Sequence, residues 1–474
     1  LVVGSEGVFG IVTSAELRLW PAPAARTFAS MSFASVEAGC DAIRDMFQAG
    51  LRPAVCRLYD AFDSWMAKRG AVTGKKKSAS SASSRALKNA AVRWVLRAPR
   101  ALNGLVDAIG DRAFGGVTLI LVFEGEASHG QSDVERAKHI ARRHGATDLG
   151  EAPARHWLEH RYAVSYRQSP VFMSGAFSDT MEVAAPWSRL VPMYHAVRRA
   201  ISGRVFVMAH FSHAYPDGAS IYFTFAGSAG DRASSEALYD STWQDALDAA
   251  IDAGGTLSHH HGVGRSKAPK LGRELGLGVD VIHALRGVFD PAGIFNPGNL
   301  VPRERGKKAI DIDSVPPDRA PRFDDASLLV HASGKTPLGL VEEEARAHGL
   351  TLSIEGLDAS EPVASYLARG APGAPDPWSD PVDHVVAGFR AKLAEGGELV
   401  VRPGPRRAVG PDLYALFHGM HGRVGDIVSA HLRTHRVGLS SRPAPSTIER
   451  DPSLSSDEAT WVERVAETAR RVGG

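Results

Sequence analysis

The spacing of apolar and polar positions between residues 23 and 300 predicts both strands and helices. Apolar runs or alternating patterns predict strands at residues 30–33, 117–124, 205–211 and 220–225. Helical spacing predicts helices at residues 36–48, 132–143, 187–201 and 233–253. Ser132 or Asp133 is the expected cap of the second helix, and Pro186 is expected to open the third. The mixture is typical of the α+β class.

A glycine-rich stretch precedes these elements. Residues 4–10, GSEGVFG, predict a loop, and residues 11–19 predict a strand with Ile11, Thr13, Ala15 and Leu17 on one side. The glycines let backbone amides approach an anionic or planar ligand, although an ordinary glycine turn has the same composition. The chain opens with Leu1 inside this pattern, so we expect further protein sequence upstream.

The composition is that of a globular protein in aqueous surroundings. The chain has 474 residues, of which 44% are hydrophobic and 23% charged, so two to four domains are expected. A net charge of +2 argues against nucleic acid as a partner. The only cysteines, Cys40 and Cys56, argue against a disulfide framework and favour a reducing, cytoplasmic compartment. No apolar run approaches the length of a membrane-spanning helix.

Residues 64–106 carry ten basic side chains and no acidic one. Apolar residues, among them Trp94, are interspersed with these cations until Pro99 ends the expected helix. Such a segment can lie on an anionic membrane surface, as a lipid substrate would favour, or can be a solvated excursion of the protein surface. Both interpretations stay open, and so does the formation of a homo-oligomer.

The densest candidate chemistry lies in residues 254–265, GGTLSHHHGVGR. His259, His260 and His261 are flanked by glycines, and imidazole is the side chain that gives or takes a proton most easily near neutral pH. Proton transfer against a flat or large ligand is the favoured interpretation, and histidines satisfied within the core are the alternative. On an extended segment His260 would point away from the other two, and no cysteine or acid lies close in sequence, so we predict no metal.

The strand expected at residues 220–225 places Ser220, Tyr222 and Thr224 on one face and three apolar residues on the other. Tyr222 therefore lies on the more polar face, which favours a functional role over a place in the core. A phenol has an ordinary pKa near about 10, and this pKa must be lowered before the group acts as a base. We expect nearby imidazolium or arginine groups to lower the pKa of Tyr222.

Four stretches together resemble the alkyldihydroxyacetonephosphate synthase family, which belongs to the vanillyl-alcohol-oxidase-type flavoproteins. They are residues 1–21, LVVGSEGVFGIVTSAELRLWP; residues 212–225, SHAYPDGASIYFTF; residues 254–264, GGTLSHHHGVG; and residues 289–300, FDPAGIFNPGNL. The first and last are shared by many flavoproteins. The three adjacent histidines are more specific, because related 2-hydroxy-acid dehydrogenases carry a single-histidine version such as EHGIG.

This resemblance implies an FAD-dependent enzyme of ether lipid synthesis. Such an enzyme exchanges the acyl chain of acyl-dihydroxyacetone phosphate for a fatty alcohol, through a covalent adduct at flavin N5. The residues that match the family's catalytic groups are Tyr222, His259, His260, His261 and Arg57. Arg167 matches its substrate-binding arginine when one residue is inserted before EVAAPW, and a surface ion pair is the alternative for both arginines. The residues that match the flavin-contacting loop are Gly4, Ser5, Glu6, Gly7, Val8, Phe9 and Gly10.

The same resemblance divides the chain. Residues 1–22 match the end of a PCMH-type FAD-binding domain, and residues 23–302 match an α+β FAD-linked oxidase C-terminal substrate (cap) domain. A charged linker at residues 303–322, a degenerate partial FAD-binding-like domain at residues 323–450 and a C-terminal helix at residues 451–474 are expected to follow. The degenerate copy is inferred from a weak repeat, because residues 416–435 align without gaps on residues 1–20. Since His421 replaces Glu6 and Met420 replaces Ser5, we expect this copy to serve structure or docking instead of FAD binding.

Two other functions stay open. One is an FAD-linked oxidoreductase or dehydrogenase acting on a 2-hydroxy acid or an alcohol, whose substrate would reduce the flavin. A synthase, by contrast, shows no net electron transfer. The other is a truncated, catalytically incomplete flavoprotein remnant, or a scaffolding protein without activity.

Overall fold

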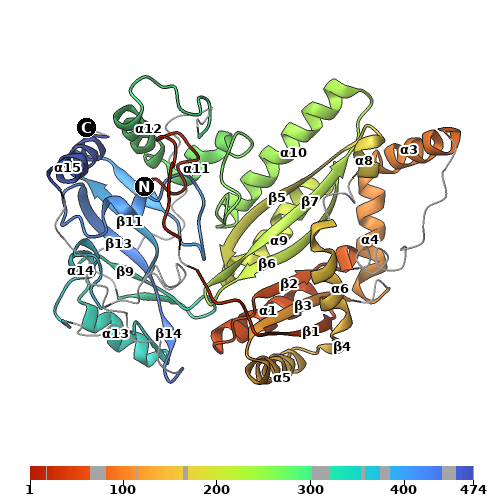
Figure 1. Cartoon of the computed structure of the whole chain (residues 1–474), viewed down its shortest axis with the longest axis horizontal. Coiled ribbons are helices and arrows are strands. Elements are labelled where there is room, and N and C mark those ends of the chain that lie inside the picture. The colour runs from red at the N-terminus through yellow and green to blue at the C-terminus, as the bar shows by residue number, and fades with distance from the viewer. Residues whose placement is uncertain are drawn as a thin grey trace.

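The computed structural model describes residues 1–17, 19–64, 82–113, 116–163, 169–300, 320–353, 358–373, 385–439 and 455–472. Two antiparallel sheets stand side by side, and the segment that follows the N-terminus runs between them (Figure 1). Residues before position 301 build the larger sheet, and residues after position 320 build the smaller one.

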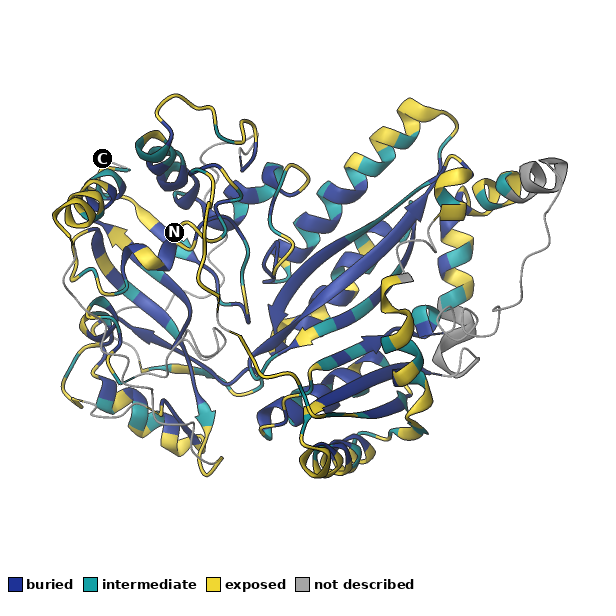
Figure 2. Cartoon of the chain, in the orientation of Figure 1, coloured by how far each residue is buried: buried dark blue, intermediate teal, exposed yellow. Residues whose placement is uncertain are grey.

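The larger sheet has seven strands in the order β4-β1-β3-β2-β6-β7-β5. Their bounds are Ala25–Phe33 (β1), Val55–Tyr59 (β2), Val117–Gly125 (β3), Thr147–Gly150 (β4), Phe177–Pro186 (β5), Phe206–Ala214 (β6) and Gly218–Gly227 (β7). All neighbouring strands in it pair antiparallel. The strands are mostly buried (Figure 2).

Helices cover this sheet on both faces. The main apolar core joins one face to α1 (Val36–Gln48), α5 (Ala127–Arg143), α9 (Trp187–Ile201) and α10 (Arg232–Asp252). On the other face α6 (Ala152–His160) packs on β1 and β3, and α3 (Ala82–Leu96) and α4 (Pro99–Ala113) pack beside β6 and β7. Short helices follow at α8 (Ser169–Met173) and α11 (Leu271–Leu275), and α12 (Gly278–Phe289) completes this part.

The smaller sheet has the order β12-β11-β13-β9-β8. Its strands are Arg322–Asp324 (β8), Leu329–Ser333 (β9), Val386–Leu393 (β11), Glu398–Val401 (β12) and Gly425–Arg433 (β13), and β10 (Leu350–Thr351) pairs with β14 (His435–Arg436) apart from it. The helices here are α13 (Leu338–Ala347), α14 (Val363–Ala368) and α15 (Ser456–Arg470). Polar contacts join the two parts: the buried Arg433 lies 3.0 Å from Asp217, and the buried Arg402 donates to the carbonyl of Ile251.

Most elements expected before residue 300 are confirmed, and two helices, α1 and α9, have the expected bounds. The second expected helix begins earlier than predicted. α5 starts at Ala127 after Glu126, and neither Ser132 nor Asp133 caps it. The helix continues through these polar positions because they face solvent, while Gly130, Val134 and Ala137 on the other side are buried.

The strand expected at residues 11–19 is wrong for residues 11–17 and 19, which form no strand. Ile11, Leu17 and Leu19 are between 77% and 85% exposed, so these apolar side chains lie in solvent (Figure 2). A strand needs neighbours for its backbone hydrogen bonds, and no described residue pairs with this segment.

The weak repeat in the sequence corresponds to a repeated backbone conformation. Gly4, Glu6 and Gly7 have φ of 82°, 51° and 77°, and their counterparts Gly419, His421 and Gly422 have φ of 71°, 50° and 78°. The two copies diverge after this loop. In the second copy the strand β13 forms, because β11 and β9 flank it on either side.

The basic segment is only partly described, because residues 65–81 lie outside the described ranges. Within the rest, Trp94 is 73% exposed, and Val95 and Leu105 are exposed as well. Among the described residues, no helix combines the length and the apolar character that crossing a membrane requires.

Candidate active site

The larger sheet assembles a polar row across three neighbouring strands. His210 of β6 lies opposite Tyr222 of β7, which lies opposite Glu182 of β5. Opposed residues in a sheet share a face, so these side chains point the same way. The rings of His210 and Tyr222 stack, with centroids 4.7 Å apart. Tyr222 therefore lies on the polar face of β7, as alternation predicted. The neighbouring strand β5 supplies the carboxylate of Glu182 to the same face.

Glu182 is fully buried and anchors the histidine motif. Its two carboxylate oxygens accept the backbone N–H of His259 at 3.0 and 3.1 Å, and Ser258 Oγ donates to it at 3.2 Å. The ammonium of Lys267, itself buried, lies 3.7 Å away. Burial works to raise the pKa of Glu182, but the contact with His260, the charge of Lys267 and the backbone N–H of His259 prevail and lower it to about 2.

Sequence reasoning missed Glu182 and Lys267. The available signal was an acid in the middle of the buried strand FSDTMEVAAP, because a buried carboxylate requires partners. Burial is also the main reason why the pKa of Lys267 falls to about 8.

The three histidines lie on a bent segment beside the edge strand β5, where Thr256 forms a bridge with Ala184. The expectation that His260 points away from its neighbours is wrong, because the segment turns instead of running as a strand. His260 Nε2 lies 2.9 Å from Tyr222 Oη, and its Nδ1 lies 2.8 Å from His259 Nδ1. His259 Nε2 lies 2.8 Å from Tyr215 Oη. The result is a chain of hydrogen-bonding groups from Tyr222 to Tyr215.

Electrostatics differ from expectation at Tyr222. Burial and the charge of Glu182 raise the pKa of this phenol, and Arg57 only partly counters them. The predicted lowering is therefore wrong, because the buried carboxylate and the loss of hydration outweigh the guanidinium. The phenol is protonated at neutral pH. Burial also lowers the pKa of His259 to about 3 and that of His213 to about 4, so these imidazoles are neutral.

Arg57 of β2 reaches the same face. Its guanidinium lies 5.9 Å from the centre of the Tyr222 ring, and its Nη2 lies 2.6 Å from His210 Nε2. Arg57 Nε is buried without a hydrogen-bond partner among the described residues, which is the arrangement expected of a group that meets a ligand. His261 stands edge-on to Tyr222. Arg167 lies outside the described residues.

The loop of residues 4–10 is tied to the histidine motif by Glu6. Its carboxylate accepts the backbone N–H groups of Val263 at 2.5 Å and Gly264 at 2.8 Å, and Asn299 Nδ2 donates to it at 2.7 Å. Asn296 Nδ2 donates to the Glu6 carbonyl. Ser5, Val8 and Phe9 are buried, and Phe9 stacks on Phe289. The Glu6 carboxylate thus joins three of the four stretches named in the sequence, and the contact between Tyr222 and His260 joins the fourth.

This arrangement fits the reacting end of a flavin. Gly10 and Gly264 have φ of 146° and 53° and leave open space beside their Cα atoms. A planar ring can approach the main chain closely at such positions. Tyr222 and His260 supply proton-transferring side chains at the same site. Flavin-dependent chemistry needs such groups.

A transition metal is an alternative ligand for part of the cluster. Among the described residues, the ligand atoms of His213, His259 and His260 lie within 4.8 Å of one another. The prediction of no metal concerned the three adjacent histidines alone, because His213 comes from the end of β6 and not from the histidine motif.

Gly255 fixes how closely the motif packs. A Cβ there would overlap the sulfur of Met193 and come within 3.1 Å of the carbonyl oxygens of Ala250 and Ala184. We expect Gly255→Ala to destabilise the protein by about 1–3 kcal/mol in urea unfolding. Gly287→Ala is the matched control, because nothing lies near that position on α12 and alanine favours a helix by up to about 1 kcal/mol. Equal stability of the Gly255→Ala protein would contradict the close packing.

A pH dependence follows from His259. Its pKa is lower in the folded protein (about 3) than the ordinary 6.5, so between these values the unfolded chain binds a proton that the native protein does not. Stability is therefore lost as the pH falls below 6.5. Between pH 7 and pH 5, the unfolding free energy of wild type should fall by about 2 kcal/mol more than that of His259→Gln. Asp60 changes the stability in the opposite direction, because burial raises its pKa to about 7. This contribution is the same in both proteins and cancels from their difference.

The control for this pH series is His139→Gln, which removes an exposed imidazole from α5. A difference from wild type that is larger for His259→Gln than for His139→Gln assigns the effect to the buried position. Parallel curves for wild type and His259→Gln would contradict a neutral, buried His259.

The comparisons with known proteins find relatives that match about two thirds of this chain. Alkyldihydroxyacetonephosphate synthase of Trypanosoma brucei brucei is 25% identical over 331 residues, covering 65% of this chain and 49% of that protein. The synthase of Dictyostelium discoideum is 25% identical over 332 residues, covering 66% of this chain and 51% of that protein. The glycolate oxidase subunit GlcD of Bacillus subtilis (strain 168) is 23% identical over 315 residues, covering 65% of this chain and 58% of that protein.

The chain thus spans about half the length of the two synthases that it resembles. The family model for FAD linked oxidases, C-terminal domain, matches residues 22–300, which is more than half of the 474 residues. This match covers every strand of the larger sheet, the row of Tyr222 and Glu182, and the histidine motif. The chain belongs to the family of FAD linked oxidases, C-terminal domain.

Proposed function

We propose that this chain carries the substrate-binding and proton-transferring half of an alkyldihydroxyacetonephosphate synthase-like enzyme that uses FAD. The observation that supports this most is the hydrogen-bonded chain from Tyr222 through His260 and His259 to Tyr215. Only the presence of adjacent histidines creates that chain, and a single histidine in the motif would not.

In the proposed reaction, acyl-dihydroxyacetone phosphate and a fatty alcohol give alkyl-dihydroxyacetone phosphate and a fatty acid. The bond between the substrate carbon and the acyloxy oxygen breaks, and a bond from that carbon to the alcohol oxygen forms. No net oxidation occurs. FAD, when bound, supplies an electron-accepting ring for the reacting carbon, and the loop of residues 4–10 with the backbone at Gly264 would hold that ring.

Tyr222 moves the proton in this proposal. Its phenol is protonated, so its oxygen takes a proton from the substrate carbon only as its own hydrogen passes to His260 Nε2, 2.9 Å away. His259 holds the His260 ring from the other side, and Glu182 fixes the backbone of His259. Arg57, whose Nε has no hydrogen-bond partner among the described residues, would bind the phosphate of the substrate, and Arg167 would assist it.

The part that follows residue 320 has a supporting role in this proposal. It covers the histidine motif, because the backbone N–H of Ala408 donates to the Ser258 carbonyl at 3.0 Å. Its loop at residues 419–422 keeps the backbone of the flavin-contacting loop but carries His421 where Glu6 supplies a carboxylate. We therefore assign it structural support instead of a second FAD site.

Contact with a lipid surface through residues 64–106 is a further part of the proposal. The exposed Trp94 lies among the cations of this segment, which suits an anionic interface. Sedimentation with anionic vesicles should recover wild type, and Trp94→Ser should lower that recovery several-fold. Equal recovery with neutral and anionic vesicles would argue for a solvated surface instead.

The experiment that tests the function uses the 474-residue chain mixed with FAD and separated by gel filtration. Retained flavin absorbance is followed by an assay with acyl-dihydroxyacetone phosphate and fatty alcohol under anaerobic conditions. Ether formation without flavin bleaching supports the synthase. Bleaching by a 2-hydroxy acid such as glycolate supports an oxidoreductase, the second candidate, which the similarity to a glycolate oxidase subunit favours. If flavin is bound but neither activity is found, both proposed functions are contradicted.

A further inference from the structure

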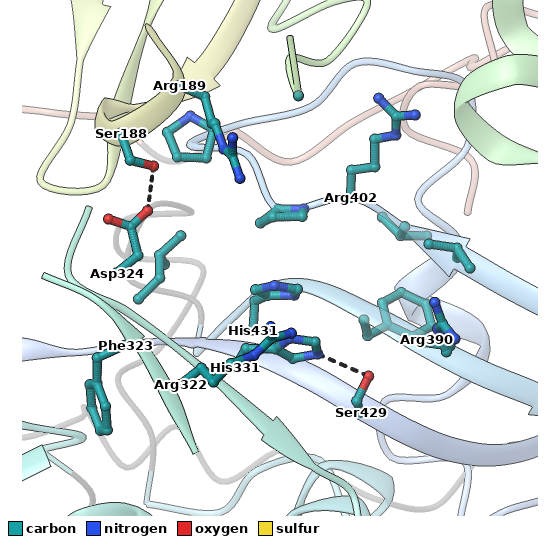
Figure 3. A pocket seen from close by; sticks show the side chains of 17 residues that line it. Ser188, Arg189, Arg322, Phe323, Asp324, His331, Arg390, Arg402, Ser429 and His431 are labelled. Atoms are coloured by element: carbon teal, nitrogen blue, oxygen red, sulfur yellow. Dashed lines mark hydrogen bonds between the residues drawn. The ribbon is translucent and has the colours of Figure 1, made fainter. Parts of the chain in front are cut away.

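A cavity lies between the start of α9 and one face of the smaller sheet (Figure 3). Its volume is about 500 Å³, which is in the range of pockets for small ligands. Residues from both parts of the chain line it, but none of the residues placed in the proposed reaction does.

The register of the smaller sheet assembles one wall of the cavity. Arg322 of β8 lies opposite His331 of β9, and His331 lies opposite His431 of β13. Two residues back along β13, Ser429 lies opposite Arg390 of β11. Opposed residues, and residues two apart in a strand, share a face, so these five polar side chains are presented together (Figure 3).

The two histidines form a flat surface within this wall. Their rings stack with centroids 3.9 Å apart and 14° between the planes, and His331 Nε2 lies 3.1 Å from Ser429 Oγ. Burial and the nearby charges of Arg322 and other arginines lower the pKa of His431 to about 3. His431 is therefore uncharged at neutral pH, and guanidinium groups bring positive charge to the cavity.

These guanidinium groups outnumber the acids. Four arginines, Arg189, Arg322, Arg390 and Arg402, line the cavity against one carboxylate, Asp324, which accepts from Ser188 Oγ at 2.5 Å. Arg189 and Arg322 come from opposite parts of the chain and are exposed. Arg189 stands in the first turn of α9, where no acidic residue offsets the positive end of the helix dipole.

We propose that this cavity binds a small molecule that bears a phosphate group. Like charges gathered around one space repel each other, and an anion in that space removes the repulsion. Arg390 is paired with Glu398 at 3.3 Å, and Arg402 donates to backbone carbonyls, so Arg189 and Arg322 are the guanidinium groups best placed to meet an anion. Guanidinium groups bind phosphate through paired hydrogen bonds. The inference is independent of the function proposed for the Tyr222 site.

The test measures binding of inorganic phosphate and of AMP to the 474-residue chain by calorimetry, with ionic strength held constant by NaCl. Wild type should bind at least one of the two saturably. The double variant Arg189→Gln/Arg322→Gln should bind it at least about 10-fold more weakly, because two charged contacts are lost. Arg232→Gln, which removes a 92% exposed arginine on α10, is the matched control and should bind as wild type does.

The variant Arg57→Gln distinguishes binding in this cavity from binding at the Tyr222 site. If Arg57→Gln abolishes the binding and Arg189→Gln/Arg322→Gln does not, the ligand occupies the other site and the proposal is wrong. The absence of saturable binding of both probes to wild type would overturn it as well. A second readout is the ¹H–¹³C NMR signal of the His331 and His431 rings, which should shift with ligand in wild type and in Arg57→Gln but not in the double variant.

Discussion

Replacing Tyr222 by phenylalanine is expected to slow ether formation by a factor on the order of 10³, the typical contribution of a positioned acid–base group. The substitution removes only the hydroxyl that lies 2.9 Å from His260 Nε2. The ring stays stacked on His210, so the sheet keeps its packing. The assay measures turnover of the FAD-loaded protein, with the visible flavin spectrum as the measure of cofactor binding.

Tyr215→Phe is the matched control for this experiment. This variant also removes one hydroxyl. That hydroxyl lies 2.8 Å from His259 Nε2, at the opposite end of the hydrogen-bonded chain from Tyr222. A relay that starts at Tyr222 predicts a much smaller loss at Tyr215. Unchanged turnover in Tyr222→Phe with flavin retained would remove Tyr222 from the mechanism, and equal losses in both variants would indicate a structural role.

Replacing Glu182 by alanine is expected to destabilise the protein by about 3–5 kcal/mol, the usual cost of breaking a buried ion pair. The change leaves the buried Lys267 without its carboxylate, and it leaves the backbone N–H of His259 without its acceptor. Both losses occur where water is excluded, so neither is made good by hydration. Urea unfolding followed by circular dichroism measures the effect.

The double variant Glu182→Ala/Lys267→Met separates the two causes. If the unpaired ammonium carries most of the cost, the double variant should recover more than half of the lost stability. Glu182→Gln should lie between wild type and Glu182→Ala, because its amide oxygen can still accept from His259. Additive losses in the double variant would contradict a direct pairing of Glu182 with Lys267.

These two predictions depend on different sources of information. Tyr222 was found in the sequence, because alternation placed it on the polar face of a strand and the motif SIYF marked it. Glu182 was not found, although it lies in the middle of a buried strand. No local pattern in FSDTMEVAAP tells which partners a buried carboxylate has, since Lys267 and His259 are more than 70 residues away in the chain.

The same division holds for the N-terminal segment. Its loop was recognised correctly, because glycines with positive φ leave a clear mark in a sequence. Its strand was not, because the pattern of Ile11, Leu17 and Leu19 describes a strand only where neighbours exist to pair with it. The equivalent residues of the second copy have such neighbours in β11 and β9, and there the strand β13 forms.

The sequence by itself determined the α+β character, the bounds of α1 and α9, and the stretches that meet around Tyr222, since these depend on local periodicity and on short motifs. The tertiary structure alone decided which groups Glu6 and Glu182 hold, that burial raises the pKa of Tyr222, and that arginines from α9 and from the smaller sheet line one cavity. The physical reason is common to all three. Desolvation and pairing energies depend on which groups the folded chain brings within a few ångströms, and separation in sequence does not encode that distance.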